Sequence, residues 1–140
     1  DIRKALGVGL SDALRTTRTA QLWSYREATR ANYLANSDIV KGWIWFATLD
    51  ERTCMSCMAM HGTIHPLTEA LNDHHNGRCA MLPQIEGVDY GLDDAKAWFD
   101  AQPEPAKQAQ MGRAKYDATP PVNSSLASYL KSERMKCTAR

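Results

Sequence analysis

The feature that most constrains the fold of this chain is a cluster of cysteines and histidines near its middle. Cys54 and Cys57 form a C-x-x-C pair, and Cys79 follows the pair His74-His75 farther along the chain. Two residues between cysteines allow a tight turn to aim both sulfurs at one point. Structural zinc is usually held by four tetrahedral ligands drawn from Cys and His. The sequence therefore predicts a zinc site formed by Cys54, Cys57, Cys79 and one histidine.

Four histidines compete for the fourth ligand position. His74 is the first choice and His75 the second, because both lie close to Cys79 in the sequence. His61 lies four residues after Cys57, on the same predicted turn, and His65 lies in a predicted strand. The alternative is a metal-free cluster in which the paired cysteines are small core residues and the histidines are exposed.

Cysteine count and charge restrict the functional classes. Four cysteines, of which Cys137 lies far from the others, are too few and too unevenly spread for a disulfide scaffold, so we expect a reducing compartment.

The net charge of +1 gives no electrostatic argument for a dedicated nucleic-acid binder. Basic residues do gather near the N-terminus, where Arg15, Arg18 and Arg26 are candidates for contact with DNA or an acidic protein. No apolar run reaches the roughly 18–20 residues of a membrane helix.

Hydrophobic periodicity predicts helices at both ends of the chain and a small sheet between them. Leucines recur at i, i+4 near the N-terminus, which indicates an amphipathic helix. Residues 39–48 are rich in β-branched and aromatic residues, which favours a strand buried on both faces through its middle. The first predicted element is a helix over 1–35 with a break near Gly7 and Gly9. Three strands follow over 39–48, 62–65 and 78–82, and Pro83 ends the last of them. The remaining elements are a helix with Leu92, Ala95 and Phe99 on one face and Asp93 and Asp94 at its start, a helix over 105–116, and a short helix capped by Asn123.

This order of elements predicts an α+β fold with the Cys/His loop inserted into the sheet. The length of 140 residues is enough for about one domain. We divide the chain into an N-terminal helical segment (1–38), a core that contains the Cys/His knuckle and the helices after it (39–118), and a linker with a helical tail (119–140).

Two other chemistries use similar residues. A thioredoxin-like redox pair also uses C-x-x-C, but that motif opens a helix in a βαβ unit, and here we expect it to lead into a loop that contains glycine. His74-His75-Asn76 is similar to the paired histidines of HNH-type nucleases, yet no histidine follows His75 to complete such a site. A metal-dependent nuclease or toxin domain is therefore an alternative, as is a general zinc-knuckle binding module.

One stretch of the chain is similar to a known family. The motif Asp50-x-Arg52-Thr53-Cys54-x-x-Cys57 resembles the phage Mu F-like head-morphogenesis proteins, also called minor head or minor capsid proteins. The resemblance covers roughly residues 10–117 and is carried further by Arg15-Thr16-Thr17-Arg18, Trp45, Gly62 and the segment from His74 to Cys79. The chain departs from the family pattern at His61, which stands where the family has an acidic residue, at His75, which stands where it has proline, and at Gly77, which stands where an optional cysteine occurs.

The resemblance implies a structural protein of the phage head and no enzymatic activity. By alignment the zinc ligands would be Cys54, Cys57, His74 and Cys79, with Asp50 and Arg52 either orienting the loop or forming a weak surface pair. The implied partners are the portal protein and other capsid components, with packaged DNA as a further contact through Arg15, Arg18 and Arg26, and no small-molecule substrate. The implied location is the interior of the virion head, and the host cytoplasm during assembly.

Overall fold

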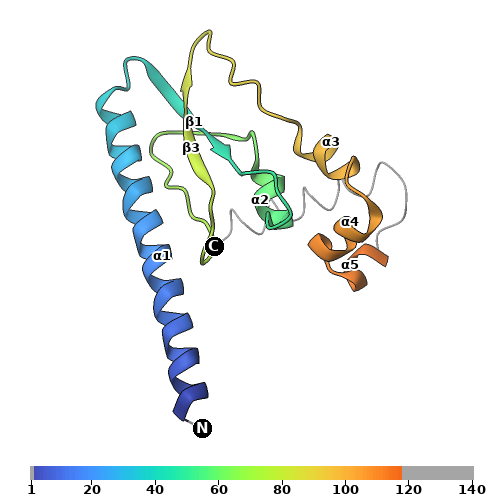
Figure 1. Cartoon of the computed structure of the whole chain (residues 1–140). Helices are drawn as coiled ribbons and strands as arrows, with labels where there is room; N and C mark the ends of the chain where they lie inside the picture. Colours follow the sequence, from blue (N-terminus) through green and yellow to red (C-terminus); the bar gives the residue numbers. More distant parts are fainter. Residues whose placement is uncertain (1, 118–140) are drawn as a thin grey trace.

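The computed structural model of the chain describes residues 2–117, and it confirms the predicted α+β architecture (Figure 1). A long helix lies beside a three-stranded antiparallel sheet, and short helices lie on the other side of the sheet. The elements are α1 (Ile2–Ala35), β1 (Val40–Phe46), α2 (Met55–Met60), β2 (Ile64–His65), β3 (Ala80–Ile85), α3 (Ala95–Asp100), α4 (Glu104–Met111) and α5 (Arg113–Asp117). The predicted helix at Asn123, the tail 119–140 and Cys137 lie outside the described residues.

Helix α1 is continuous over 34 residues, so the predicted break at Gly7 and Gly9 is wrong. A glycine inside a helix costs about 1 kcal/mol relative to alanine, which weakens a helix without ending it. At 1.5 Å per residue the helix is about 51 Å long, and its N-terminal half extends past the sheet (Figure 1). Residues 9–18 are all exposed. No helix among residues 2–117 has the length and apolar character needed to cross a membrane.

The sheet has β1 at its centre, with β2 and β3 paired antiparallel on either side. Trp43 and Trp45 are 0% and 3% exposed, as expected for the middle of the apolar run 39–48. Gly42 allows the strands to approach, because a Cβ there would lie 2.7 Å from the His65 carbonyl oxygen. The central strand therefore carries the main core beside the cysteines.

Pro83 does not end the third strand, contrary to the prediction. Strand β3 continues to Ile85, and Pro83 pairs with Trp43. Since β3 lies at the edge of the sheet, alternate N–H groups point away from β1, and a proline at such a position removes no ladder hydrogen bond.

The short helices α3 and α4 pack against α2. Helix α2 was not predicted from the sequence. Met55 and Met58 of α2 join one core cluster with Phe99 of α3 and Met111 of α4, whereas Cys57 joins the cluster on the sheet. The predicted acidic start of α3 is confirmed at Asp94, whose side chain caps the helix by accepting a hydrogen bond from the Ala97 N–H at 2.6 Å. Leu92, which was predicted on the same helical face, precedes the helix.

The helix predicted over 105–116 is divided in two. Gly112 has φ +81° and separates α4 from α5. This left-handed backbone favours glycine and is a common way for a helix to end.

Candidate metal centre

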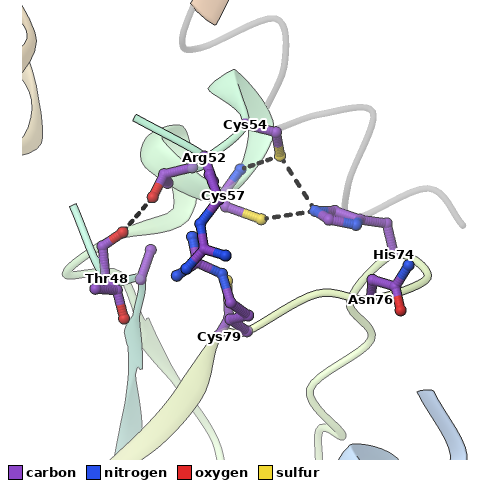
Figure 2. A pocket seen from close by; sticks show the side chains of 10 residues that line it. Thr48, Arg52, Cys54, Cys57, His74, Asn76 and Cys79 are labelled. Atoms are coloured by element: carbon purple, nitrogen blue, oxygen red, sulfur yellow. Dashed lines mark hydrogen bonds between the residues drawn. The ribbon is translucent and has the colours of Figure 1, made fainter. Parts of the chain in front are cut away.

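Three of the predicted ligands converge at one point (Figure 2). His74 Nε2 lies 3.3 Å from Cys54 Sγ and 3.3 Å from Cys57 Sγ. In a tetrahedral zinc site with Zn–S of about 2.3 Å and Zn–N of about 2.0 Å, a sulfur and a nitrogen ligand lie about 3.5 Å apart. The spacing of the three atoms is therefore compatible with a shared metal ion.

Cys79 reaches the cluster from the other side of Cys57. The ligand atoms of Cys57, Cys79 and Asp73 lie within 4.8 Å of one another, as do those of Cys54, Cys57 and His74. Cys57 belongs to both groups, so the four predicted ligands form one continuous cluster with Asp73 added to it. The sequence analysis did not single out Asp73, although it directly precedes His74.

The beginning of α2 positions the two paired cysteines. Cys54 is the N-cap residue of α2, and its sulfur accepts a hydrogen bond from the Cys57 N–H at 3.3 Å. The C-x-x-C pair thus opens a short helix, and the expectation that it leads into a loop is wrong. The strands joined by this helix, β1 and β2, are antiparallel, so the parallel βαβ context of a redox motif is not present here.

The turn before Cys54 is held by polar side chains of the family-like motif. The Thr53 hydroxyl donates to the Thr48 carbonyl oxygen and accepts from the Asp50 N–H at 3.2 Å. Gln110 of α4 donates through Nε2 to the carbonyl oxygens of Asp50 and Thr53 at 3.0 and 2.7 Å. These bonds satisfy backbone groups that the tight turn leaves unpaired and fix the entry into α2.

Asp50 connects this turn to the segment around Cys79. Its carboxylate accepts two hydrogen bonds from the Arg78 guanidinium, at 2.7 and 2.6 Å, and a third from the Arg52 N–H at 3.0 Å. The bonds from Arg78 are the main reason that the pKa of Asp50 lies well below its usual range. The side chain of Arg52 is 72% exposed and approaches Asp50 only to 3.9 Å. Asp50 therefore orients the loop, which was one of the two roles expected for Asp50 and Arg52. Its main partner is Arg78 and not the side chain of Arg52.

Arg26 lies beneath the cluster and does not reach the surface. It is 6% exposed, and it donates to the Cys79 carbonyl oxygen through Nε at 3.0 Å and through Nη2 at 2.7 Å. Nη2 also reaches the Gly77 carbonyl oxygen at 3.0 Å and Asp73 Oδ2 at 2.9 Å. The expected DNA contact through Arg26 is therefore wrong, because its guanidinium is enclosed between α1 and the loop 73–79.

Asp73 is the buried partner of Arg26. Its side chain is 1% exposed and also accepts hydrogen bonds from the N–H groups of His74 at 2.8 Å and Cys79 at 3.2 Å. A Cβ atom at Gly77 would collide with this carboxylate. The glycine is thus required by the folded loop, which explains why no cysteine stands at that position.

The other histidines lie away from the sulfurs. His61 Nδ1 accepts from the Ala47 N–H at 3.0 Å, and burial lowers the pKa of His61. His65 stacks on Trp43 with ring centroids 4.3 Å apart. His75 is exposed. Among the described residues, His74 is the histidine that belongs to a metal-binding group.

The charges of the cluster favour an ionised sulfur. A hydrogen bond with Cys57, followed by one with His74, lowers the pKa of the Cys54 thiol to about 4. The hydrogen bond with Cys54 raises the pKa of His74 to about 9, and hydrogen bonds with Cys54 and Cys79 raise the pKa of Cys57. A metal that binds all three residues would displace protons from His74 and Cys57.

Comparisons with protein-family models, curated proteins and solved structures find no match. The chemistry of the cluster therefore rests on its own residues, which are sulfur and imidazole groups of the kind that bind zinc and other thiophilic metals.

Proposed function

We propose that this chain is a structural minor head protein of a phage, similar to the Mu F-like family, in which Cys54, Cys57, His74 and Cys79 hold one structural zinc ion. One observation carries the proposal: the residues that resemble the family motif are also the residues that build the cluster. Asp50 and Thr53 shape the turn before Cys54. Arg78 binds Asp50 from the segment beside Cys79.

The zinc would clamp together parts of the fold that are weak alone. Strand β2 has only two residues, and a small sheet of this kind is marginal without further support. A metal shared between the start of α2 and the loop 73–79 would join both to α1 through Arg26. Binding energy at such a site becomes folding energy. Sulfur and imidazole ligands in a tetrahedral arrangement favour zinc over the hard cations magnesium and calcium.

The proposed partners are the portal protein and other components of the capsid, inside the head of the virion and in the host cytoplasm during assembly. The exposed N-terminal half of α1 supports a role in assembly, because it presents Leu10 and Leu14, 63% and 45% exposed, at a spacing of one helical turn. An apolar stripe on an otherwise polar helix suits contact with another protein.

The zinc proposal is tested by elemental analysis of the purified chain and by thermal melting with and without a strong chelator. We expect one zinc per chain, a lower melting temperature after chelation, and retention of most helical signal from α1. Cys57→Ser should abolish zinc binding, whereas Cys137→Ser, the same change outside the described residues, should not. Absence of zinc together with an unchanged melting temperature would refute the clamp.

The head-protein role has a separate test. Co-expression with the portal protein of the same phage should yield a complex that survives size-exclusion chromatography. A plasmid-nicking assay with magnesium addresses the nuclease alternative, in which cleavage by the wild-type chain and its loss in His74→Ala and His75→Ala would replace the structural proposal.

A further inference from the structure

A groove of about 930 Å³ lies between α1 and the loop that carries His74. Helix α1 contributes Arg18, Leu22 and Tyr25 to one wall, and Arg52, His75 and Arg78 contribute to the other. Among residues 2–117, no aspartate or glutamate lines it. A chain with a net charge of only +1 thus concentrates three arginines, from three separate segments, around one concave surface.

The arginines of this groove differ in how much charge they can offer to a ligand. Arg18 has no ion pair within the described residues, and Arg52 lies 3.9 Å from the carboxylate of Asp50 with a side chain that is 72% exposed. The charge of Arg78 is largely neutralised by its two bonds to Asp50, which also fix its orientation. One unpaired positive charge at Arg18, one weakly paired charge at Arg52 and the oriented guanidinium of Arg78 therefore line the groove.

The groove also contains an exposed aromatic side chain. Tyr25 is 66% exposed although it directly precedes the buried Arg26, and Leu22 on the same wall is half-buried. An aromatic ring next to arginines is the arrangement by which proteins hold single-stranded nucleic acid, with the charges on the phosphates and the ring against a base.

We infer that this groove binds single-stranded nucleic acid, with Arg18 and Arg52 on the backbone phosphates and Tyr25 stacked on an unpaired base. A duplex hides the faces of its bases, and an acidic peptide has no flat ring to stack, so either ligand would use the charges and leave Tyr25 without a role. The volume falls within the range of about 300–1,000 Å³ typical of small-ligand sites, which suits a short stretch of one strand.

The walls of the groove are held at a fixed separation. The Asn76 N–H donates to Thr19 Oγ1 of α1 at 3.2 Å, and Arg26 joins the same loop to α1 from below. The inference rests on the proposed zinc site to this extent, because the ion would hold His74 and thereby the loop. Zinc content is therefore measured on every protein used in the test.

The test is fluorescence anisotropy with a labelled oligothymidylate of about 20 nucleotides, longer than the roughly 4–16 nucleotides that one groove covers. Salt dependence is measured as well, because each phosphate contact contributes about −0.7 to the slope of log affinity against log salt. Arg18→Ala combined with Arg52→Ala should weaken binding at least tenfold and flatten the slope by about 1.4.

Arg30→Ala combined with Arg113→Ala is the matched control, since neither residue lines the groove and the pair removes the same two positive charges. Tyr25→Ala should weaken binding about 5- to 150-fold, the equivalent of 1–3 kcal/mol of stacking, whereas Tyr25→Phe should bind like the wild type.

Four outcomes overturn the inference. Equal affinity of the Arg18/Arg52 and the Arg30/Arg113 double variants would show that the groove does not bind the oligonucleotide. Binding of a duplex as tightly as the oligothymidylate, with no effect of Tyr25→Ala, would assign the groove to duplex DNA. Displacement by polyglutamate, again without an effect of Tyr25→Ala, would assign it to an acidic protein. A protein that contains zinc but does not bind the oligonucleotide refutes the groove alone, and one that binds without zinc refutes the clamp alone.

Discussion

Replacement of Arg26 by alanine offers the sharpest test of how the cluster is built. Arg26 is 6% exposed and donates hydrogen bonds to Asp73 and to the carbonyl oxygens of Gly77 and Cys79. Removing one partner of a buried ion pair costs about 3–5 kcal/mol, because the other charge is left buried and unpaired. Asp73 retains bonds from the N–H groups of His74 and Cys79, whereas the carbonyl oxygens of Gly77 and Cys79 lose the Arg26 donor. We therefore expect a loss of about 3–5 kcal/mol.

That loss is large beside the total stability of about 5–15 kcal/mol that is usual for a domain. It corresponds to a decrease of about 10–17 °C in the melting temperature of a chain of this size. Arg30→Ala is the matched control on the same helix, because Arg30 pairs with Glu27 at i, i+3 and both side chains are 27% exposed. Such a pair contributes about 0.2–0.5 kcal/mol.

The assay is urea denaturation in excess zinc, followed by tryptophan fluorescence, in which the buried Trp43 and Trp45 become exposed on unfolding. A double-mutant cycle with Asp73→Ala isolates the pair from the other bonds of Arg26. Neighbouring charges should show a coupling free energy above about 1 kcal/mol, with the double variant less destabilised than the sum of the single ones. A loss below 1 kcal/mol for Arg26→Ala, or strictly additive losses, would refute the role of Arg26 as the buried link between α1 and the loop.

Two further predictions concern the loop and its ion pair. Gly77→Ala should lower the free energy of unfolding by about 1–3 kcal/mol through collision with Asp73, whereas Gly9→Ala, in an open helical position, should raise it by about 0.5–1 kcal/mol; equal urea midpoints for the two variants would contradict this. The lowered pKa of Asp50 means that its pair with Arg78 adds stability above the unfolded pKa of about 3.9 and loses it as the pH falls below that value. Asp50→Asn should therefore flatten the acid side of a plot of stability against pH, and parallel curves from pH 7 to pH 2 would show that Asp50 contributes nothing through its charge.

Local patterns in the sequence were sufficient to predict the elements around the site. The apolar run 39–48 predicts β1, and the acidic pair before Ala95 predicts the capped start of α3, because strand composition and helix capping depend on neighbouring residues. The C-x-x-C spacing likewise brings Cys54 and Cys57 together, whatever the rest of the chain does. The broken first helix and the early end of β3 were wrong, since a continuous helix and an edge strand tolerate the residues that suggested those breaks.

Which histidine joins the cysteines, and what supports them, was decided by the tertiary structure. His74 and His75 are adjacent and chemically identical, and only the path of the loop past α2 brings the first of them to the sulfurs.

The support beneath the cluster depends on residues far apart in the sequence. Arg26 lies 47 positions from Asp73 and 53 from Cys79, and nothing near it marks it as buried until α1 packs against β3. The sequence by itself therefore determined the ligand types and their local spacing, because spacing is set by the geometry of short turns. Tertiary packing decided the buried ion pair, the place of Gly77 and the groove, because these depend on how α1 and the loop meet.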